Sequence, residues 1–160
     1  VTINGVSKSH AMTGWRIGYC GGPAELVAAM TTIQGQSTSN PSSISQKAAT
    51  VALTGDQACV ARMNEAFKAR HDFVVAGLDA LPGVTARPGF GTFYAFANVE
   101  GAMARLGCAD DHAFAEKVLE DALVAVVPGS AFGAPGHVRL SFASSMESLE
   151  KALARIARLL

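Results

Sequence analysis

Residues 5–19 read Gly-Val-Ser-Lys-Ser-His-Ala-Met-Thr-Gly-Trp-Arg-Ile-Gly-Tyr, and this stretch decides the interpretation of the whole chain. Lys8 closely follows a glycine and a serine, and Arg16 lies eight residues further on, between Gly14 and Gly18. An amine can form a Schiff base with an aldehyde cofactor, and a guanidinium can bind a phosphate through two parallel hydrogen bonds. The alternative is a solvated surface lysine beside an ordinary ion-paired arginine. The spacing favours the amine held near a phosphate-sized anion.

The composition is that of a folded domain with a sizeable core. The chain has 160 residues, of which 49% are hydrophobic and 16% charged, so extensive disorder is not expected. Thirteen basic and thirteen acidic side chains give a formal net charge of zero. This balance does not favour nucleic acid as a partner.

The cysteines and the apolar runs exclude other classes. Cys20, Cys59 and Cys108 are odd in number and widely spaced, which argues against a disulfide framework or a zinc site. The four histidines lack ligand spacing as well, so we expect no metal. No apolar run reaches the roughly 20 residues of a membrane span. We expect reduced thiols and a cytoplasmic location.

The hydrophobic pattern alternates between strands and helices. The predicted strands are 1–6, 15–19, 84–87, 92–98, 124–127 and 137–142. Four predicted helices are 24–33, 43–53, 102–106 and 110–122. A longer helix begins near Asp56 and ends before residues 81–83. A last helix is capped by Ser144, and Glu147 completes a capping box with it. This order predicts an α/β fold with an α+β tail. His71 lies on the apolar side of the long helix, and we interpret it as a packed histidine rather than a ligand.

The segment from Gly5 to Gly18 resembles the lysine-attachment signature of the class I and II pyridoxal-phosphate aminotransferases, the group that includes aspartate aminotransferase. The positions that carry the resemblance are Ser7, Lys8, Met12, Gly14, Arg16, Ile17 and Gly18. Residues 88–94, PGFGTFY, resemble the small-domain strand of this family. Residues 127–133, VPGSAFG, and 137–143, HVRLSFA, resemble its late carboxylate-binding region.

The resemblance implies roles for four residues. Lys8 would hold pyridoxal 5′-phosphate as an internal imine and would move the substrate's α-proton. Arg16 would bind the cofactor's phosphate, with the hydroxyl of Ser7 nearby, although local backbone bonding explains a serine there equally well. Arg139 would bind the α-carboxylate of the amino acid; the alternative is an edge-strand arginine that points to water. Gly5 stands where some relatives place a serine for the phosphate.

The resemblance also implies a fold and an organisation. We expect the C-terminal portion of a fold type I enzyme: the end of the large domain at 1–55, a bridging helix at 56–82 and the small domain at 83–160. Residues 36–41 resemble the loop that approaches the partner subunit, which implies a homodimer.

The predicted activity is transfer of an amino group between an amino acid and a 2-oxo acid, feeble or absent in the isolated piece. Two alternatives stay open. One is another pyridoxal-phosphate enzyme of the same fold, such as a carbon–sulfur lyase or an aminocyclopropane carboxylate synthase. The other is a structural or dimer-forming module without activity.

Overall fold

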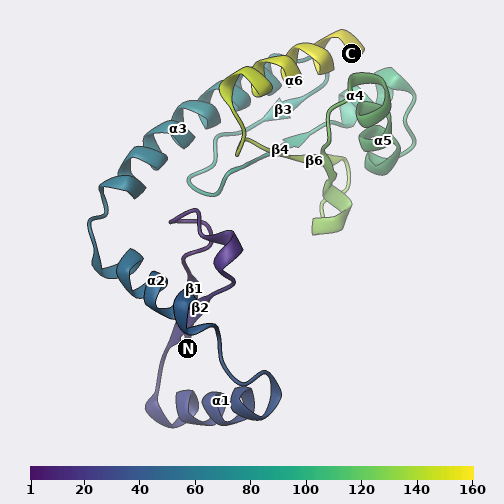
Figure 1. Ribbon diagram of the computed structural model, residues 1–160. Coiled ribbons are helices and arrows are strands. Elements are labelled where there is room, and N and C mark those ends of the chain that lie inside the picture. The colour runs from purple at the N-terminus through teal and green to yellow at the C-terminus, as the bar shows by residue number, and fades with distance from the viewer. The chain divides into compact units, whose positions relative to one another are not determined.

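The computed structural model describes all 160 residues, which form two compact units, residues 1–64 and 65–160. The boundary between the units falls inside the longest helix, α3 (Ala58–Asp79) (Figure 1). The side chain of Asp56 accepts the backbone N–H of Ala58 at 3.0 Å. A carboxylate at this position satisfies one of the free N–H groups at the start of a helix, so Asp56 caps α3 close to its predicted start.

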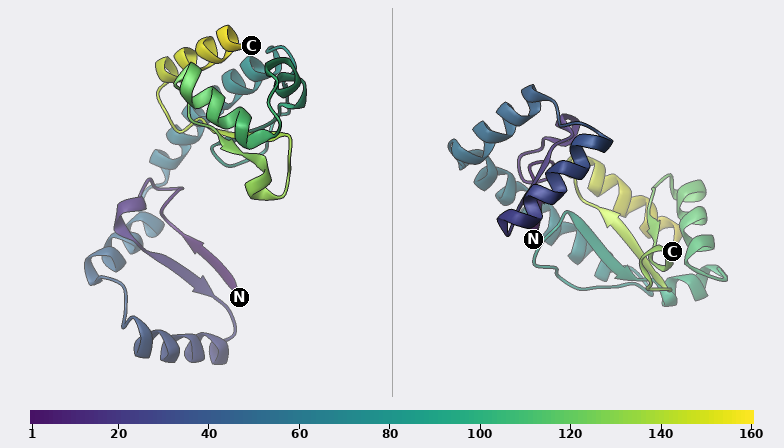
Figure 2. Two further views of the ribbon diagram at one scale, coloured as in Figure 1. Left: turned by 90° about the vertical axis from the view of Figure 1, so that its right-hand side faces the viewer. Right: turned by 90° about the horizontal axis from the view of Figure 1, so that it is seen from below.

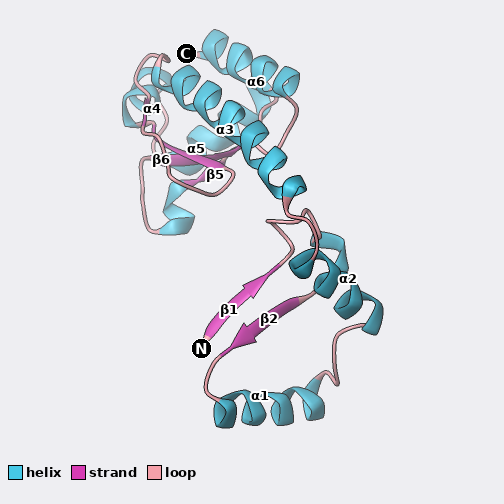
Figure 3. Ribbon diagram, turned by 90° about the vertical axis from the view of Figure 1, so that its left-hand side faces the viewer, coloured by secondary structure: helices cyan, strands magenta, loops and turns pink.

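The first unit is built on one antiparallel pair of strands (Figure 3). Its strands pair from Thr2 with Gly21 to Gly5 with Gly18. A short 3-10 turn interrupts the connection between the strands, and two helices follow the second strand. The elements are β1 (Thr2–Gly5), η1 (Thr13–Trp15), β2 (Gly18–Gly21), α1 (Ala24–Ser37) and α2 (Ser43–Thr54).

Two predicted boundaries in this unit are wrong. The strand predicted over 15–19 begins only at Gly18, because Trp15 ends the η1 turn and Arg16 has left-handed backbone angles, φ 49° and ψ 52°. Extended strand geometry cannot pass through such a residue. Helix α1 continues to Ser37, beyond the predicted end at residue 33. Gly35, two residues beyond the predicted end, lies inside α1, so this glycine does not stop the helix.

The first unit buries few side chains of its own. Only Val6, Ser45 and Ala49 are buried among residues 1–64. Large apolar side chains are instead exposed on both strands and both helices; they include Ile3, Tyr19, Leu26, Ile33, Ile44 and Val51. Where such exposed apolar side chains form a patch, the patch is typical of a face that other polypeptide covers.

The second unit contains a four-stranded antiparallel sheet in the order β3-β4-β6-β5. The strands are β3 (Thr85–Ala86), β4 (Tyr94–Asn98), β5 (Val127–Pro128) and β6 (His137–Ser141). Strand β6 is therefore interior, with β4 on one side and β5 on the other. The predicted strands at 84–87, 92–98 and 124–127 are longer than those observed. Thr92, with φ 68°, delays the start of β4.

One face of this sheet carries the hydrophobic core. Alternation along the strands places Ala95 and Ala97 of β4 with Val138 and Leu140 of β6 on that face, all buried. Side chains from α3, α5 (Asp111–Ala122) and α6 (Met146–Leu159) pack against them, including Val74, Leu78, Phe114, Val118, Leu153 and Ile156. Seen from below in Figure 2, the strands lie in front of α6. The helices thus cover one face and leave the other to polar and aromatic side chains.

Capping residues define one end of each remaining helix. Helix α4 (Glu100–Leu106) ends at Gly107, whose φ of 66° suits glycine. Asp110 caps α5, as predicted, by accepting the N–H of Ala113 at 2.8 Å. The predicted cap of the last helix is one residue off: Ser145, not Ser144, accepts the N–H of Ser148.

The capping box predicted for the last helix is wrong for the same reason. The cap at Ser145 puts Ser148, rather than Glu147, at the third helical position. Glu147 instead forms an ion pair with Lys151 one turn along α6. Such a pair between residues four apart lies on the solvent side of the helix.

Candidate active site

Lys8 lies in a tight turn at the start of the connection between β1 and β2. The N–H of His10 donates to the carbonyl of Val6 at 3.2 Å, and the N–H of Ala11 donates to the carbonyl of Lys8 at 3.2 Å. Val6, 1% exposed, is the buried residue that precedes the turn. The Lys8 side chain is exposed. The backbone of the lysine is thus fixed by hydrogen bonds on both sides.

Side-chain hydrogen bonds hold the same turn to the segment before α3. The hydroxyl of Ser9 donates to Nδ1 of His10 at 2.9 Å, and Nε2 of His10 donates to Oε1 of Gln57 at 3.1 Å. The Gln57 amide nitrogen donates to the carbonyls of Ala52 and Gly55, which leaves its oxygen as the acceptor for His10. The turn that carries Lys8 is therefore tied to a residue 47 positions from His10.

Arg16 lies near the end of the same connection. Its φ of 49° is a left-handed conformation that costs a non-glycine residue about 1–2 kcal/mol. One guanidinium nitrogen, Nη1, donates to the carbonyl of Thr13 at 3.0 Å, and no carboxylate forms an ion pair with Arg16. A strained backbone that presents an unneutralised cation is an arrangement found at anion sites.

Ser7 is half-buried in the turn beside Lys8. Its hydroxyl makes no hydrogen bond within the chain, so the local backbone bonding considered for it is not observed. The connection between β1 and β2 therefore contains all three residues predicted around the cofactor: an amine, a guanidinium and a hydroxyl.

Arg139 belongs to the second unit and lies on the open face of its sheet. It is half-buried on β6, opposite Phe96 of β4. Its Cζ atom lies 4.2 Å from the ring centroid of Tyr94 and 4.5 Å from that of Phe132. No carboxylate pairs with it. The alternative of an edge-strand arginine is wrong, because β6 lies between two neighbouring strands.

A buried carboxylate holds the turn that carries Phe132. This turn, η2 (Gly129–Phe132), follows β5. The N–H of Ser130 donates to Oδ2 of Asp111 at 2.7 Å, and its hydroxyl shares a 3.0 Å hydrogen bond with Nε2 of His112. Burial alone would raise the pKa of Asp111, but the hydrogen bonds from Ser130, together with the backbone N–H of Asp111 and the nearby His112, outweigh it and lower that pKa below its ordinary value. The carboxylate therefore stays charged and keeps η2 fixed to the start of α5.

His71 is packed, as predicted, and it is also hydrogen-bonded. Its ring contacts Phe142 edge-on, with centroids 5.7 Å apart. Nε2 accepts the N–H of Gly89 at 3.0 Å, so the ring proton is on Nδ1, which donates to Asp72. The hydrogen bond from Lys68, followed by that from His71, lowers the pKa of Asp72. His71 thus holds the loop before β4 to helix α3.

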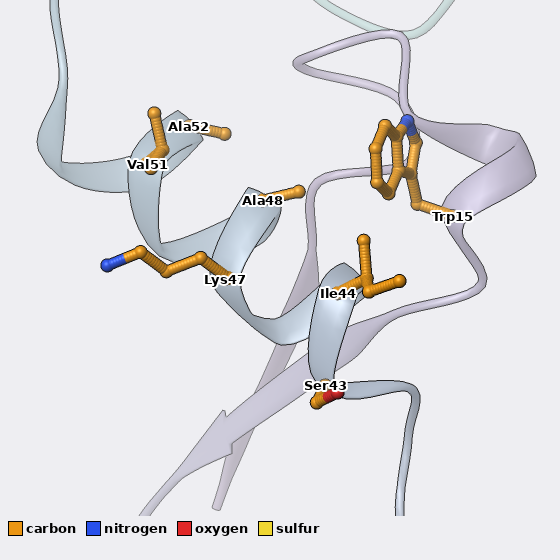
Figure 4. A pocket seen from close by; sticks show the side chains of 7 residues that line it. All are labelled: Trp15, Ser43, Ile44, Lys47, Ala48, Val51 and Ala52. Atoms are coloured by element: carbon orange, nitrogen blue, oxygen red, sulfur yellow. The ribbon is translucent and has the colours of Figure 1, made fainter.

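Trp15 packs beside α2 in the first unit. Figure 4 shows its indole facing Ile44, Ala48 and Ala52, while Lys47 points away from it. Together with Ser43 and Val51 these residues line an open, largely apolar groove. The groove contains no carboxylate or histidine, and its chemistry does not suggest a reaction.

The sequence did not reveal the roles of Tyr94 and Phe132. Both belong to the segments that resemble family motifs, but nothing in the order of residues places them beside the same arginine. The alternation of β4 and β6 would have put Tyr94 and Arg139 on one face only if the strand register were known. No group of three or more His, Cys, Asp or Glu side chains is arranged to hold a metal ion, and no helix has the length and apolarity to cross a bilayer.

Comparison with known proteins places this geometry in a family. The family described as aminotransferase class I and II matches residues 1–156. The chain belongs to the class I and II aminotransferases.

Members with similar sequences include the aspartate/prephenate aminotransferase of Nitrosomonas europaea, 54% identical over 100% of this chain and 42% of the relative. The aspartate aminotransferase of Geobacillus stearothermophilus is 50% identical over 99% of the chain and 40% of the relative. The chain therefore spans about 40% of the length of the aminotransferases that it matches.

Solved structures of aminotransferases agree. The aspartate aminotransferase of Rhizobium meliloti matches with a TM-score of 0.90 at 48% identity, over 98% of this chain and 40% of that one. The Thermus thermophilus aspartate aminotransferase with maleate matches with a TM-score of 0.90 at 46% identity, over 99% of this chain and 41% of that one. These matches confirm the predicted mixed α/β fold.

Pyridoxal 5′-phosphate is the cofactor expected for a member of this family. The donor set between β1 and β2 fits such a group. Lys8 is an exposed residue, and the guanidinium of Arg16 has no acidic partner within the chain. A permanent cation with a planar fork is suited to a phosphate dianion.

Proposed function

We propose that this chain forms part of an aspartate aminotransferase-like enzyme that moves an amino group between an amino acid and a 2-oxo acid. The observation that carries the proposal is the common location of Lys8 and Arg16 in one connection between two paired strands. Membership of the family and 54% identity to an aspartate/prephenate aminotransferase support it. The names of these relatives favour aspartate as the amino donor.

In this proposal Lys8, Arg16 and Ser7 hold the cofactor. Nζ of Lys8 attaches to it, the guanidinium of Arg16 binds its phosphate, and the hydroxyl of Ser7 donates to the same phosphate. When bound, pyridoxal phosphate supplies an electron sink for the bonds at the substrate's Cα. Nζ of Lys8, released when the substrate's amino group takes its place on the cofactor, would then accept the α-proton from Cα as the general base.

Arg139 binds the α-carboxylate of the amino acid in the same proposal. The half-buried guanidinium has no anionic partner within the chain, and a substrate carboxylate would supply one. Its position on the open face of the sheet supports this role, since the opposite face is filled by helices. Arg139 would orient the substrate and leave the proton transfer to Lys8.

We further propose that the chain by itself turns over substrate feebly or not at all, and that the working enzyme is a homodimer. The exposed apolar side chains of residues 1–64 support this, because they form surface that further polypeptide covers. Residues 36–41, which end α1 and continue through Ser39 at φ 65°, are proposed to approach the partner subunit.

Two assays of the chain test these statements. Titration with pyridoxal phosphate should change the cofactor's absorbance, an effect lost in Lys8→Ala and kept in Lys47→Ala. Lys47 is the matched control because it is exposed and lies in the same unit. An unchanged spectrum at saturating cofactor would favour a module without activity. Robust turnover of aspartate and 2-oxoglutarate would refute the proposed inactivity of the isolated chain.

A further inference from the structure

The guanidinium of Arg139 lies between two aromatic rings that come from different elements. Tyr94 is on β4, on the same sheet face as Arg139, since Phe96 pairs with Arg139 and Tyr94 pairs with Ser141 two residues further on. Phe132 is the last residue of η2. The Cζ atom lies 4.2 Å from the first ring centroid and 4.5 Å from the second.

The two rings are on different sides of the guanidinium. Each contacts other rings: Tyr94 packs on Phe93, and Phe132 meets Phe96 edge-on. They make no ring contact with each other, although both centroids lie within 4.5 Å of one carbon atom. The two rings therefore contact the guanidinium from different directions.

The edge of the guanidinium stays available. Arg139 donates no hydrogen bond to any backbone or side-chain group and has no ion pair. The structure also has no buried side-chain nitrogen without a partner, so its N–H groups face solvent. A ligand that approaches in the plane of the fork meets two parallel N–H groups that match the two oxygens of a carboxylate.

The contacts of Gly129 and of the Asp111 carboxylate fix the position of the Phe132 ring. At Gly129 an added Cβ would lie 2.7 Å from Cβ of His137 and would also overlap the carbonyl of Ala134, so only glycine lets η2 approach β6. Gly133, with φ 75°, ends the turn directly after Phe132. With Ser130 held by Asp111, the position of Phe132 is determined at both ends of η2.

We propose that Tyr94 and Phe132 form an aromatic clamp that positions Arg139 for a planar carboxylate. This inference rests on the carboxylate-binding role proposed above for Arg139. The rings hold the long side chain in one orientation, so less conformational freedom is lost when the anion binds. Tyr94 and Phe132 are positioning residues, because they act through Arg139 rather than on the substrate.

The clamp can be tested in the chain with isotope-labelled arginine. The Nε–Hε signal of Arg139, assigned by its loss in Arg139→Lys, should be shielded by the ring currents relative to exposed Arg62. Tyr94→Leu and Phe132→Leu should each move it toward the Arg62 value, whereas Tyr94→Phe should keep it. Phe90→Leu is the matched control, since Phe90 is fully exposed and makes no ring contact. Far-UV circular dichroism shows which variants fold.

Titration with sodium acetate separates the clamp from the proposed function. Each leucine variant should bind acetate about two- to fivefold more weakly at Arg139 than the unmodified chain, the range expected for one partly exposed cation–π contact. Equal acetate affinity in the unmodified chain and the leucine variants would overturn the clamp and leave the role of Arg139 intact. A shielded signal that acetate never shifts would overturn the role of Arg139, and the inference with it. An unshielded signal in the unmodified chain would also overturn the clamp.

Discussion

The N–H of Ser130 donates a 2.7 Å hydrogen bond to Oδ2 of Asp111, a carboxylate that is only 2% exposed. This contact joins the turn that carries Phe132 to the first residue of α5. The hydrogen bonds from Ser130 lower the pKa of Asp111 against the opposing effect of burial. One buried carboxylate thus links the stability of the second unit to the position of a ring that contacts Arg139.

Replacement of Asp111 should make the free energy of unfolding less dependent on pH in the acidic range. A lowered pKa in the folded state means that the carboxylate contributes stability above its ordinary value of 3.8, and that this contribution is lost as the pH falls through the folded-state pKa. At neutral pH, Asp111→Ala should cost about 1–3 kcal/mol, because the Ser130 N–H loses its buried partner. The difference from the unmodified chain should shrink below pH 3.8.

Urea unfolding followed by far-UV circular dichroism measures this difference. Fluorescence of Trp15, which belongs to the first unit, reports separately on residues 1–64 and should not change. Asp110→Ala is a useful comparison because it removes the cap of the same helix without touching Ser130. A pH-independent difference between the unmodified chain and Asp111→Ala would contradict the assigned charge state.

Alanine substitutions at Gly129 and Gly133 should have different costs. A Cβ at Gly129 would lie 2.7 Å from His137 Cβ and 2.8 Å from the His137 carbonyl oxygen, so η2 must move away from β6. Overpacking of this kind costs about 1–3 kcal/mol. Nothing lies within 4 Å of a Cβ at Gly133, where the cost comes only from its positive φ and is about 1 kcal/mol.

The Gly129→Ala and Gly133→Ala variants also report on the surroundings of Arg139. Gly129→Ala should also displace Phe132 and reduce the shielding of the Arg139 Nε–Hε signal, and Gly133→Ala should reduce it less. Thermal unfolding together with that signal checks both effects. Similar stability losses and unchanged shielding in both variants would show that the close approach of η2 to β6 does not hold the ring.

Arg16 should decide the preference for a phosphorylated cofactor. Arg16→Gln should weaken binding of pyridoxal phosphate about ten- to a hundredfold, the value of a charged hydrogen-bonding contact, and should leave binding of pyridoxal unchanged. Ser7→Ala should have a smaller effect in the same direction, and Arg62→Gln should have none. Equilibrium titrations of both cofactor forms provide the measurement. If Arg16→Gln weakened the binding of pyridoxal and of pyridoxal phosphate equally, Arg16 would not be a ligand of the phosphate.

Gly5 offers a gain-of-function variant in the same connection. A Cβ there meets only the carbonyl oxygen of Ile17 at 3.4 Å and Cα of Gly18 at 3.5 Å, which are ordinary contacts. Gly5→Ser should therefore fold normally and bind pyridoxal phosphate severalfold more tightly, since it adds a hydroxyl near the phosphate. Gly5→Ala is the control that adds the Cβ alone. Equal affinities of the two variants would argue against a phosphate close to residue 5.

Helices were easier to predict than strands in this chain. The apolar repeats of α3, α5 and α6 extend over several turns and start at Asp56, Asp110 and a serine, so their pattern and caps agree. Strands β3 and β5 contain two residues each, too few for alternation to define their ends. The left-handed backbone of Arg16 also moved the start of β2, and residue types alone do not reveal such a conformation.

The residues of the candidate site also differ in how well the sequence predicts them. Lys8, Ser7 and Arg16 were recognisable because they lie close together in the sequence. The surroundings of Arg139 were not, because Tyr94 and Phe132 reach it through strand register and through the close approach at Gly129. These depend on packing between segments that are far apart in the chain.

The most direct test of the central claim is to locate the cofactor on the chain. Incubation with pyridoxal phosphate, reduction with borohydride and peptide mapping should place the pyridoxyl group on Lys8, with little on the other four lysines. Lys8→Ala should abolish that mark without transferring it to Lys47. A label spread evenly over all lysines, or absent from Lys8 at saturating cofactor, would contradict the account.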